Sequence, residues 1–486
     1  MQYSVVNYKT VKELETLRFD AEYFHPEYLR IFNLIKEKNN RFITLSQLKI
    51  KCDASAFYPT LEPYYGQGDV PFIRVADVDD GINYDQILTI PKQILDEYKT
   101  LNLGKKGDIV LTKGGSIARA GLVIKDSALT RDLIFFNTSK LNEDDYTFYY
   151  VYCLTEFYKK QLVQSSSMTA QPHLTITLVR NIPFFYPNED FKKIIVSIFK
   201  KHSELLENSK SLYSQAEQLL LSELGLLDWK PKHELAFVKN YSATQQAERI
   251  DAEYFQPKYE EIVEAVKKYK PAFAKATAGE SGFDELGNLV KIKKSVEPGS
   301  EAYQESGTPF VRVSNLSKFE LSDNNQQFIS EELYNELKTH QPKKDEVLLS
   351  KDATPGIAYF LNEESQKMIV SGGILRLKMD SKQVLPEYLT LVLNSVIVQK
   401  QIERDAGGSI INHWRPDQVK TTLIPILKED KQKEIKELIE KSFNDRKLSK
   451  SLLEIAKRGV EMAIEKNEQE AEKWMNGEIK GLGINI

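Results

Sequence analysis

The side chains best suited to chemistry in this sequence lie in predicted loops and are of the types that contact nucleic acids. Arginine can bond guanine, and asparagine or glutamine can bond adenine, through two hydrogen bonds each, whereas lysine holds phosphates. In the first half of the chain the candidates are Tyr65, Arg74, Lys113, Ser116, Arg119, Arg131, Gln171 and His173. In the second half they are Lys294, Arg312, Lys351, Thr354, Arg376, Asn412, His413 and Arg415. Each could singly be a solvated surface group, so the prediction of DNA contacts depends on the whole set.

The sequence predicts no catalytic or metal-binding constellation. Its six histidines include no pair at metal-ligand spacing, and Cys52 and Cys153 form no C-x-x-C motif. It contains no P-loop, no dinucleotide-binding fingerprint and no Gly-x-Ser-x-Gly elbow. We therefore expect that this chain has no catalytic residue, no metal site and no bound cofactor.

One short segment leaves an enzymatic alternative open. Asn181-Ile182-Pro183-Phe184 is one residue away from the Asn-Pro-Pro-Phe loop of adenine N6-methyltransferases. However, Ile182 replaces the first proline, and no glycine-rich cofactor motif precedes it. The favoured interpretation is a strand that ends at a proline, and a degenerate methyltransferase remains the alternative.

The elements that must position these residues occur twice. The five residues Asp20 to Phe24 recur letter for letter as Asp251 to Phe255, and further matching segments follow in the same order. Arg74 and Arg312 occupy matching positions, which indicates a shared structural or phosphate role. Loops that differ between the copies (114–120 and 165–173, against 352–356 and 407–415) are better candidates for reading bases. The identical five-residue box is predicted to mark the start of each copy.

Each copy is predicted to mix short strands with helices. Val- and Ile-rich runs at 69–75, 108–112, 308–313 and 346–350 favour strands, and helices are expected at 146–163 and 386–402. Two long heptad-like patterns follow, at 189–225 and 430–474. Neither apolar stripe could remain in water, so we expect the two helices to pair. The predicted fold class is α+β: two tandem-duplicated α/β domains separated by two long helices that form an antiparallel coiled coil.

The predicted boundaries follow from these patterns. The first module with its N-terminal segment covers 1–187, and a central spacer helix covers 188–228. The second module covers 229–428, and a distal helix with a C-terminal tail covers 429–486.

Composition adds less about function. The chain has 486 residues, a formal net charge of −4 and only two cysteines, which favours a reducing environment without disulfides. No signal peptide is evident, and no run of about 18 apolar residues is present. We therefore expect a cytoplasmic protein with no membrane partner. The acidic net charge is the best support for a second alternative, a coiled-coil interaction scaffold with no nucleic-acid role.

The whole pattern resembles the specificity subunit of Type I restriction–modification systems. Residues Ser167 to Leu174, leading into Asn181-Ile182-Pro183, are similar to the Gly-Ser/Thr-x-Gln stretch that closes a target-recognition domain in that family. Residues 407–410 through Ile424-Pro425 are a more divergent version, in which Asn412-His413-Trp414 stands where glutamine is usual. The first copy departs too, because it has Ser167 where the family usually has glycine.

This resemblance implies a non-catalytic subunit that reads one half of a bipartite, asymmetric double-stranded DNA sequence with each module. The long helices would fix the unread gap between the halves. The chain would dock two adenine-N6 methyltransferase subunits and, through the complex, restriction/translocase subunits. S-adenosylmethionine, ATP and Mg would then belong to those partners and not to this chain.

Overall fold

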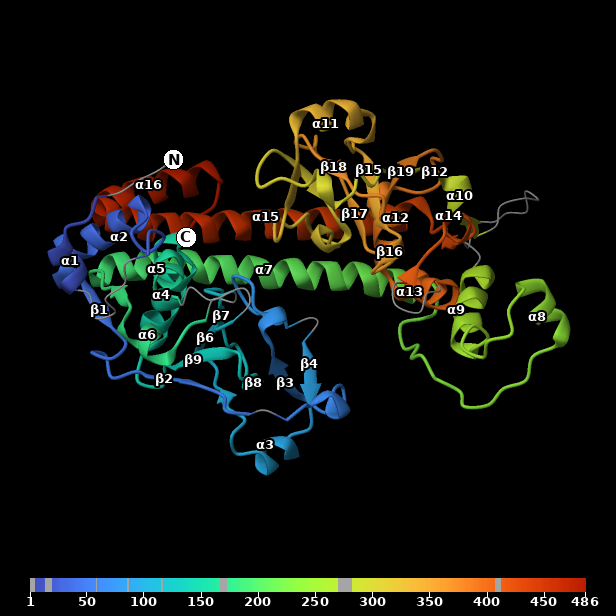
Figure 1. The fold of residues 1–486 in the computed structure, drawn as a ribbon. Coiled ribbons are helices and arrows are strands. Elements are labelled where there is room, and N and C mark those ends of the chain that lie inside the picture. The colour runs from blue at the N-terminus through green and yellow to red at the C-terminus, as the bar shows by residue number, and fades with distance from the viewer. Residues whose placement is uncertain are drawn as a thin grey trace. The chain divides into compact units, whose positions relative to one another are not determined.

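The computed structural model describes residues 5–13, 20–57, 59–84, 87–114, 117–166, 173–269, 282–406 and 412–486. The chain forms two compact units (Figure 1). Unit 1 contains Met1–Leu206 and Lys447–Ile486, and unit 2 contains Glu207–Arg446. The two long helices, α7 (Glu189–Glu223) and α15 (Glu429–Glu465), contribute residues to both units. None of the helices in the described ranges has the length and apolar character that a membrane crossing requires.

Unit 1 is built on two four-stranded sheets. The first is antiparallel, with the order β2 (Lys51–Ala54), β9 (Leu133–Asn137), β6 (Ile109–Thr112) and β7 (Ala120–Leu122). The second contains one parallel pair, β3–β8, and has the order β4 (Leu88–Ile90), β3 (Val70–Ile73), β8 (Ser127–Leu129) and β5 (Leu103–Gly104). A separate pair joins β1 (Phe42–Thr44) to β10 (Pro183–Phe185).

Unit 2 repeats this plan. Its four-stranded antiparallel sheet has the order β12 (Val290–Lys293), β19 (Ile374–Met379), β15 (Glu346–Ser350) and β17 (Ala358–Phe360). Its second sheet, with a parallel β13–β18 pair, has the order β14 (Gln327–Ile329), β13 (Thr308–Val311) and β18 (Ile369–Val370). Two small pairs complete it: β11 (Phe283–Glu285) with β21 (Leu423–Pro425), and β16 (Asp352–Ala353) with β20 (Asn412–His413). The predicted tandem α+β fold is therefore confirmed.

Short helices surround the sheets of each unit. Those of unit 1 are α1 (Tyr8–Glu13), α2 (Pro26–Glu37), α3 (Gln93–Glu97), α4 (Glu143–Leu154), α5 (Glu156–Ser165), α6 (Ile176–Asn181) and α16 (Glu468–Gly481). Those of unit 2 are α8 (Tyr241–Ala247), α9 (Pro257–Lys268), α10 (Leu286–Leu289), α11 (Glu331–Leu337), α12 (Pro386–Asn394), α13 (Val396–Asp405) and α14 (Pro416–Lys420).

The central strand of each larger sheet is buried on both faces. In unit 1, Ile109 and Leu111 of β6 belong to the core that contains α4 and α5, whereas Val110 packs in a second core with residues of the other sheet. In unit 2, Val347 and Leu348 of β15 divide in the same way between two cores. A continuous apolar run is what a strand covered on both sides requires.

Three predicted helices are interrupted at polar residues. The helix expected at 146–163 breaks at Thr155, whose hydroxyl oxygen accepts a hydrogen bond from the backbone of Tyr158 at the start of α5 (3.2 Å). The helix expected at 386–402 breaks at Ser395, between α12 and α13, where the hydroxyl caps no amide and donates to the carbonyl oxygen of Val392 (2.7 Å). The distal helix ends at Glu465, and Asn467 caps α16 by accepting from the backbone of Glu470 (2.9 Å). Side-chain oxygens that satisfy the first amides of a helix favour a new start over continuation.

The repeated five-residue box forms the same turn in both units. The carboxylate of Asp20 accepts a hydrogen bond from the backbone of Tyr23 (3.0 Å), and that of Asp251 accepts one from Tyr254 (3.2 Å). Phe24 and Phe255 are both buried, and Pro26 and Pro257 begin α2 and α9. The box is therefore a turn that starts a helix, which explains why its sequence is preserved in both copies.

The long helices pair within each unit. In unit 2, Ser209 of α7 faces Ser442 of α15, with 3.2 Å between the hydroxyl oxygens, and Glu223 reaches Lys431 at 3.7 Å. The residue numbers of these contacts rise along α7 and fall along α15, so the two helices run antiparallel. In unit 1, Nδ1 of His202 donates to the carbonyl oxygen of Ser449 (2.8 Å). The predicted antiparallel pairing is confirmed by these contacts.

His202 should make this helix pairing sensitive to acid. Burial lowers the pKa of His202 below its ordinary value, so the unfolded chain takes up the proton first. Stability is then complete above the unfolded pKa of about 6.5 and decreases as the pH falls below it, by at most about 1.4 kcal/mol per pH unit. Urea unfolding at pH 7.5 and 5.5 should show a smaller loss for His202→Gln than for the wild type. His233→Gln, which removes an exposed imidazole, serves as the control and should keep the wild-type dependence.

Candidate functional site

Three of the predicted DNA-contacting residues of unit 1 meet at one hollow. Tyr65, Arg74 and Arg131 line it, together with Phe57, Phe72 and Asp132. The hollow measures about 840 Å³, including open solvent at its mouth. The three aromatic rings are suited to a planar ligand, whereas both guanidinium groups already lie beside carboxylates, Arg131 at 3.7 Å from Asp132 and Arg74 against Asp77.

Arg74 is held by an acidic partner. Its Nε and Nη2 donate to the two carboxylate oxygens of Asp77 at 3.0 and 2.9 Å, and its backbone N–H donates to the same carboxylate (2.8 Å). The hydrogen bond with Asp77 raises the pKa of Arg74 above its ordinary value. This bidentate pair neutralises the guanidinium and caps the short 3₁₀ turn Val75–Asp77.

Arg312 has the same backbone setting without the acid. Its backbone N–H donates to the side-chain oxygen of Asn315 (3.1 Å), as that of Arg74 does to Asp77. Nη2 of Arg312 donates to the carbonyl oxygen of Asn325 (2.9 Å), and its buried Nε has no hydrogen-bond partner among the described residues. Because Asn315 is neutral, the residue three positions after Arg312 does not balance the arginine's positive charge.

A short ribbon in each unit brings predicted residues together from distant parts of the chain. In unit 1, Gly114 pairs with His173, and the backbone of Leu174 donates to the carbonyl oxygen of Lys113 (3.0 Å). In unit 2, the equivalent β16–β20 pair joins Asp352 to His413, and the backbone of Trp414 donates to the carbonyl oxygen of Lys351 (2.8 Å). Lys113 and His173 thus lie on adjoining segments of one ribbon, and Lys351 and His413 lie at the equivalent places of the other.

The ribbon of unit 2 carries an additional acid. Nδ1 of His413 lies 2.8 Å from a carboxylate oxygen of Asp352, and Lys351 forms an ion pair with the same carboxylate. Burial acts to raise the pKa of Asp352, but hydrogen bonds from Lys351 and His413 outweigh it and hold this pKa below its ordinary value. Gly114 takes the place of Asp352 in unit 1, so the two ribbons differ in charge.

The remaining predicted residues are more dispersed. Nη1 of Arg119 lies 3.7 Å from Asp79, and Nη2 of Arg415 lies 3.3 Å from Asp417 at the exposed start of α14. Thr354 follows the ribbon of unit 2, and Lys294 is exposed after β12. Ser116 and Gln171 lie outside the described residues, as does the side chain of Asn412.

Arg376 is a correction to the predicted set. It lies within β19 and its side chain is 4% exposed, between the two sheets of unit 2. Its guanidinium donates to the carbonyl oxygens of Thr339 (3.1 Å) and Gln341, and Nη1 lies 3.9 Å from Glu346. An enclosed guanidinium cannot reach a DNA surface, so Arg376 has a structural role.

Sequence reasoning missed the residues that decide the charge of the recurring arginines. Asp77 and Asn315 each stand three residues after their arginine, at the spacing of a helix cap. The matching segments Arg-Val-x-Asp and Arg-Val-x-Asn could have revealed these residues in the sequence. The difference between acid and amide becomes informative only when the structure shows that this side chain contacts the arginine.

The comparison with known families is decisive. The model of the Type I restriction modification DNA specificity domain matches residues 32–218 and 280–457. The chain belongs to this family. The two matched segments correspond to the two copies seen in the sequence and in the fold, and each includes part of a long helix.

Individual relatives are more distant. A Type I restriction enzyme MjaIX specificity subunit from Methanocaldococcus jannaschii is 26% identical over 169 residues, which cover 34% of this chain and 38% of that protein. The match therefore spans well under half of the relative's length. The S subunit of a Type I restriction-modification system from M. genitalium is 13% identical with a TM-score of 0.34, covering 92% of this chain and 96% of the other. An HsdS subunit from Thermoanaerobacter tengcongensis gives 13% identity and a TM-score of 0.27, with coverages of 88% and 97%.

Proposed function

We propose that this chain is the DNA-specificity subunit of a Type I restriction–modification complex and reads a split, asymmetric sequence through its two modules. The observation that carries this proposal is the pair of family matches, one on each copy. The two copies share recurring lysine and histidine residues but differ in charge where Gly114 corresponds to Asp352. Two modules with one fold and different contact residues suit two different half-sites.

The shared and the differing residues suggest a division of roles. The lysine–histidine pair of each ribbon recurs in both units, as does the arginine after β3 and β13. Recurring cations are suited to phosphates, which are the same in every sequence. Residues that differ, such as Gly114 against Asp352, are suited to base edges, because each base pair presents its own donor and acceptor pattern in the major groove.

The long helices complete the proposal. They pair antiparallel, and each contributes to both units, so they can serve as the spacer between half-sites. An internally duplicated chain offers two similar surfaces to two identical subunits, which suits the docking of two adenine-N6 methyltransferases. The chain itself acts as a non-catalytic part, and S-adenosylmethionine, ATP and Mg belong to the methyltransferase and restriction subunits.

Methylome sequencing of the host, with and without this chain, tests the function. Adenine methylation at one split, asymmetric sequence should disappear when the chain is deleted and return when it is restored. Exchanging residues 24–187 for those of a relative should change one half of the sequence and leave the other intact. Unchanged methylation after deletion would contradict the proposal, and a change in both halves would contradict independent reading. An interaction scaffold without a nucleic-acid role predicts no effect of either change.

A further inference from the structure

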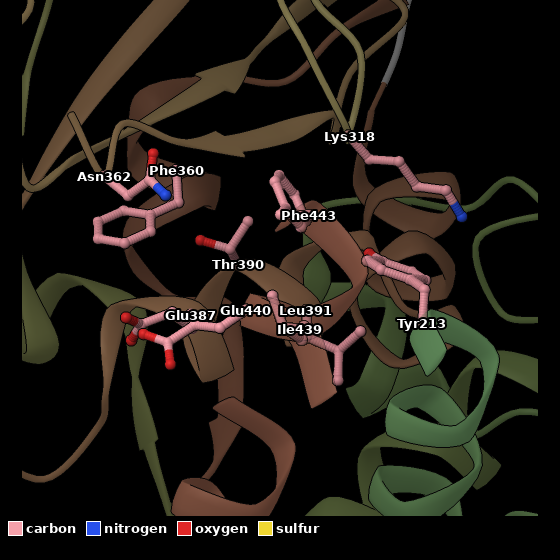
Figure 2. Close-up of a pocket in the computed structure, with 10 residues that line it drawn as sticks. All are labelled: Tyr213, Lys318, Phe360, Asn362, Glu387, Thr390, Leu391, Ile439, Glu440 and Phe443. Carbon is pink, nitrogen blue, oxygen red and sulfur yellow. The ribbon is translucent and has the colours of Figure 1, made fainter. Parts of the chain in front are cut away.

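A pocket in unit 2 has no part in the proposed DNA contacts. It lies where α12 and the end of β17 meet the paired helices α7 and α15 (Figure 2). Three aromatic rings line it, from Tyr213, Phe360 and Phe443, together with the carboxyl groups of Glu387 and Glu440. The empty space between its walls is about 440 Å³, a figure that includes open solvent at its mouth.

Glu387 leaves an unsatisfied acceptor in this pocket. Its side chain is 9% exposed, and one carboxylate oxygen lies 2.9 Å from Nζ of Lys436. The other oxygen, Oε2, is buried and has no hydrogen-bond partner among the described residues. A buried carboxylate oxygen without a donor costs free energy, so a ligand that donates to it would stabilise the folded chain.

The charge around the pocket favours a cation. Lys436 is shared between Glu387 and Glu440, which lies 3.5 Å away. Two carboxylates with one lysine leave an excess of one negative charge. Lys318 does not cancel it, because its Nζ lies 3.9 Å from Glu217 and 4.6 Å from the centre of the Tyr213 ring. Aromatic walls also attract cations through their π faces.

The first module shows that this pocket is not a necessary feature of the fold. Thr155 and Ser395 occupy equivalent positions between two helices, since in each residue the backbone N–H and the hydroxyl both donate to the carbonyl oxygen three residues earlier. Counting back five residues from Thr155 and from Ser395 shows that Tyr150 of α4 and Thr390 of α12 are equivalent positions in the two copies. Tyr150 is buried with its ring 5.5 Å from that of Phe199, whereas Thr390 borders the pocket. Counting back eight residues matches Thr147 with Glu387, so the second copy has a smaller side chain at the first of these positions and an added acid at the second.

We propose that this pocket binds a small organic ammonium ion with a single-ring or similarly compact apolar body. The ammonium group donates to Oε2 of Glu387, and the apolar body packs against Phe360, Phe443 and Tyr213. The proposal goes beyond the proposed function and does not depend on it, because all of the residues involved lie within unit 2 and none is among the proposed DNA contacts.

Calorimetric titration of the full chain with three matched probes tests the ligand class. Benzylammonium should bind with a dissociation constant of about 1 mM or below, as expected for a ligand of eight non-hydrogen atoms. Benzyl alcohol, which keeps the ring but lacks the charge, should bind at least tenfold more weakly, and benzoate should not bind. Equal affinity for all three probes, or no heat with benzylammonium up to about 10 mM, would overturn the proposal.

Variants locate the site. Glu387→Gln should weaken benzylammonium binding at least tenfold, and Thr390→Tyr should abolish it by placing the side chain of the first module in the pocket. Glu437→Gln, which removes an exposed carboxylate of α15 that does not line the pocket, should bind as the wild type does. Binding that survives both pocket variants would show that the ligand sits elsewhere. If either variant unfolds, the probe series on the wild-type chain still decides the ligand class, and the other variant decides the place.

Discussion

Replacing Arg376 with methionine is expected to lower the free energy of unfolding of unit 2 by about 3–5 kcal/mol, because it removes one partner of a buried charged pair. The guanidinium lies between two sheets and satisfies the carbonyl oxygens of Thr339 and Gln341. Its loss would leave those acceptors, and the carboxylate of Glu346 at 3.9 Å, with less compensation. Burial is also the main influence on its pKa, which it lowers.

The control for this prediction is Lys378→Met. Lys378 lies two residues further along β19 and is exposed, so its replacement removes the same charge with little effect on stability. Urea unfolding of the full chain, combined with amide hydrogen exchange of β15, would locate the loss in unit 2. Equal stability of Arg376→Met and the wild type would mean that the buried pair contributes nothing, as some buried pairs do.

Arg376 also shows why a sequence could not separate surface cations from core ones here. Strand positions are usually assigned to a face by their alternation, and in β19 the cations Arg376 and Lys378 alternate with Leu375 and Leu377, which predicts a solvent face for both cations. That face is covered at Arg376, as it is in the apolar run of β15, and is open only at Lys378. In unit 1, Val110 pairs with Phe135, as Leu348 pairs with Arg376 in unit 2. The first copy therefore places a phenyl ring where the second places a guanidinium.

The duplication and the helix pairing were predictable because they depend on local repeats and heptad spacing. The breaks at Thr155 and Ser395 were not predicted, although both residues are of capping types. Their neighbours on both sides favour helix, so residue types alone do not determine where one helix ends and the next begins. The Lys113–His173 association joins segments 60 residues apart in the chain, so no local pattern could reveal it.

The two recurring arginines provide the sharpest functional prediction, which depends on the proposed DNA role. Arg312→Ala should weaken binding of the target duplex by the assembled complex and reduce the slope of log affinity against log salt by about one. Arg74→Ala should change that slope less, because Asp77 already neutralises Arg74 within the chain. Titrations between about 50 and 200 mM salt would measure both slopes.

Exchanging the neighbouring acid and amide separates charge from side-chain shape. Asn315→Asp should recreate the closed pair of unit 1 around Arg312 and lower the salt slope, although both arginines remain. Asp77→Asn should release the guanidinium of Arg74 and raise the salt slope. The hydrogen bond from the backbone N–H of Arg74 to residue 77 should survive, since Asn315 accepts the equivalent N–H of Arg312. If both exchanges left the slopes unchanged, the arginines would serve only as caps, and the phosphate contacts would have to come from the ribbon lysines. The two exchanges should have opposite effects because the side chain three residues after each arginine differs only in one group, a carboxylate or an amide. A carboxylate there pairs with the guanidinium within the chain, whereas an amide leaves its charge available to DNA phosphates.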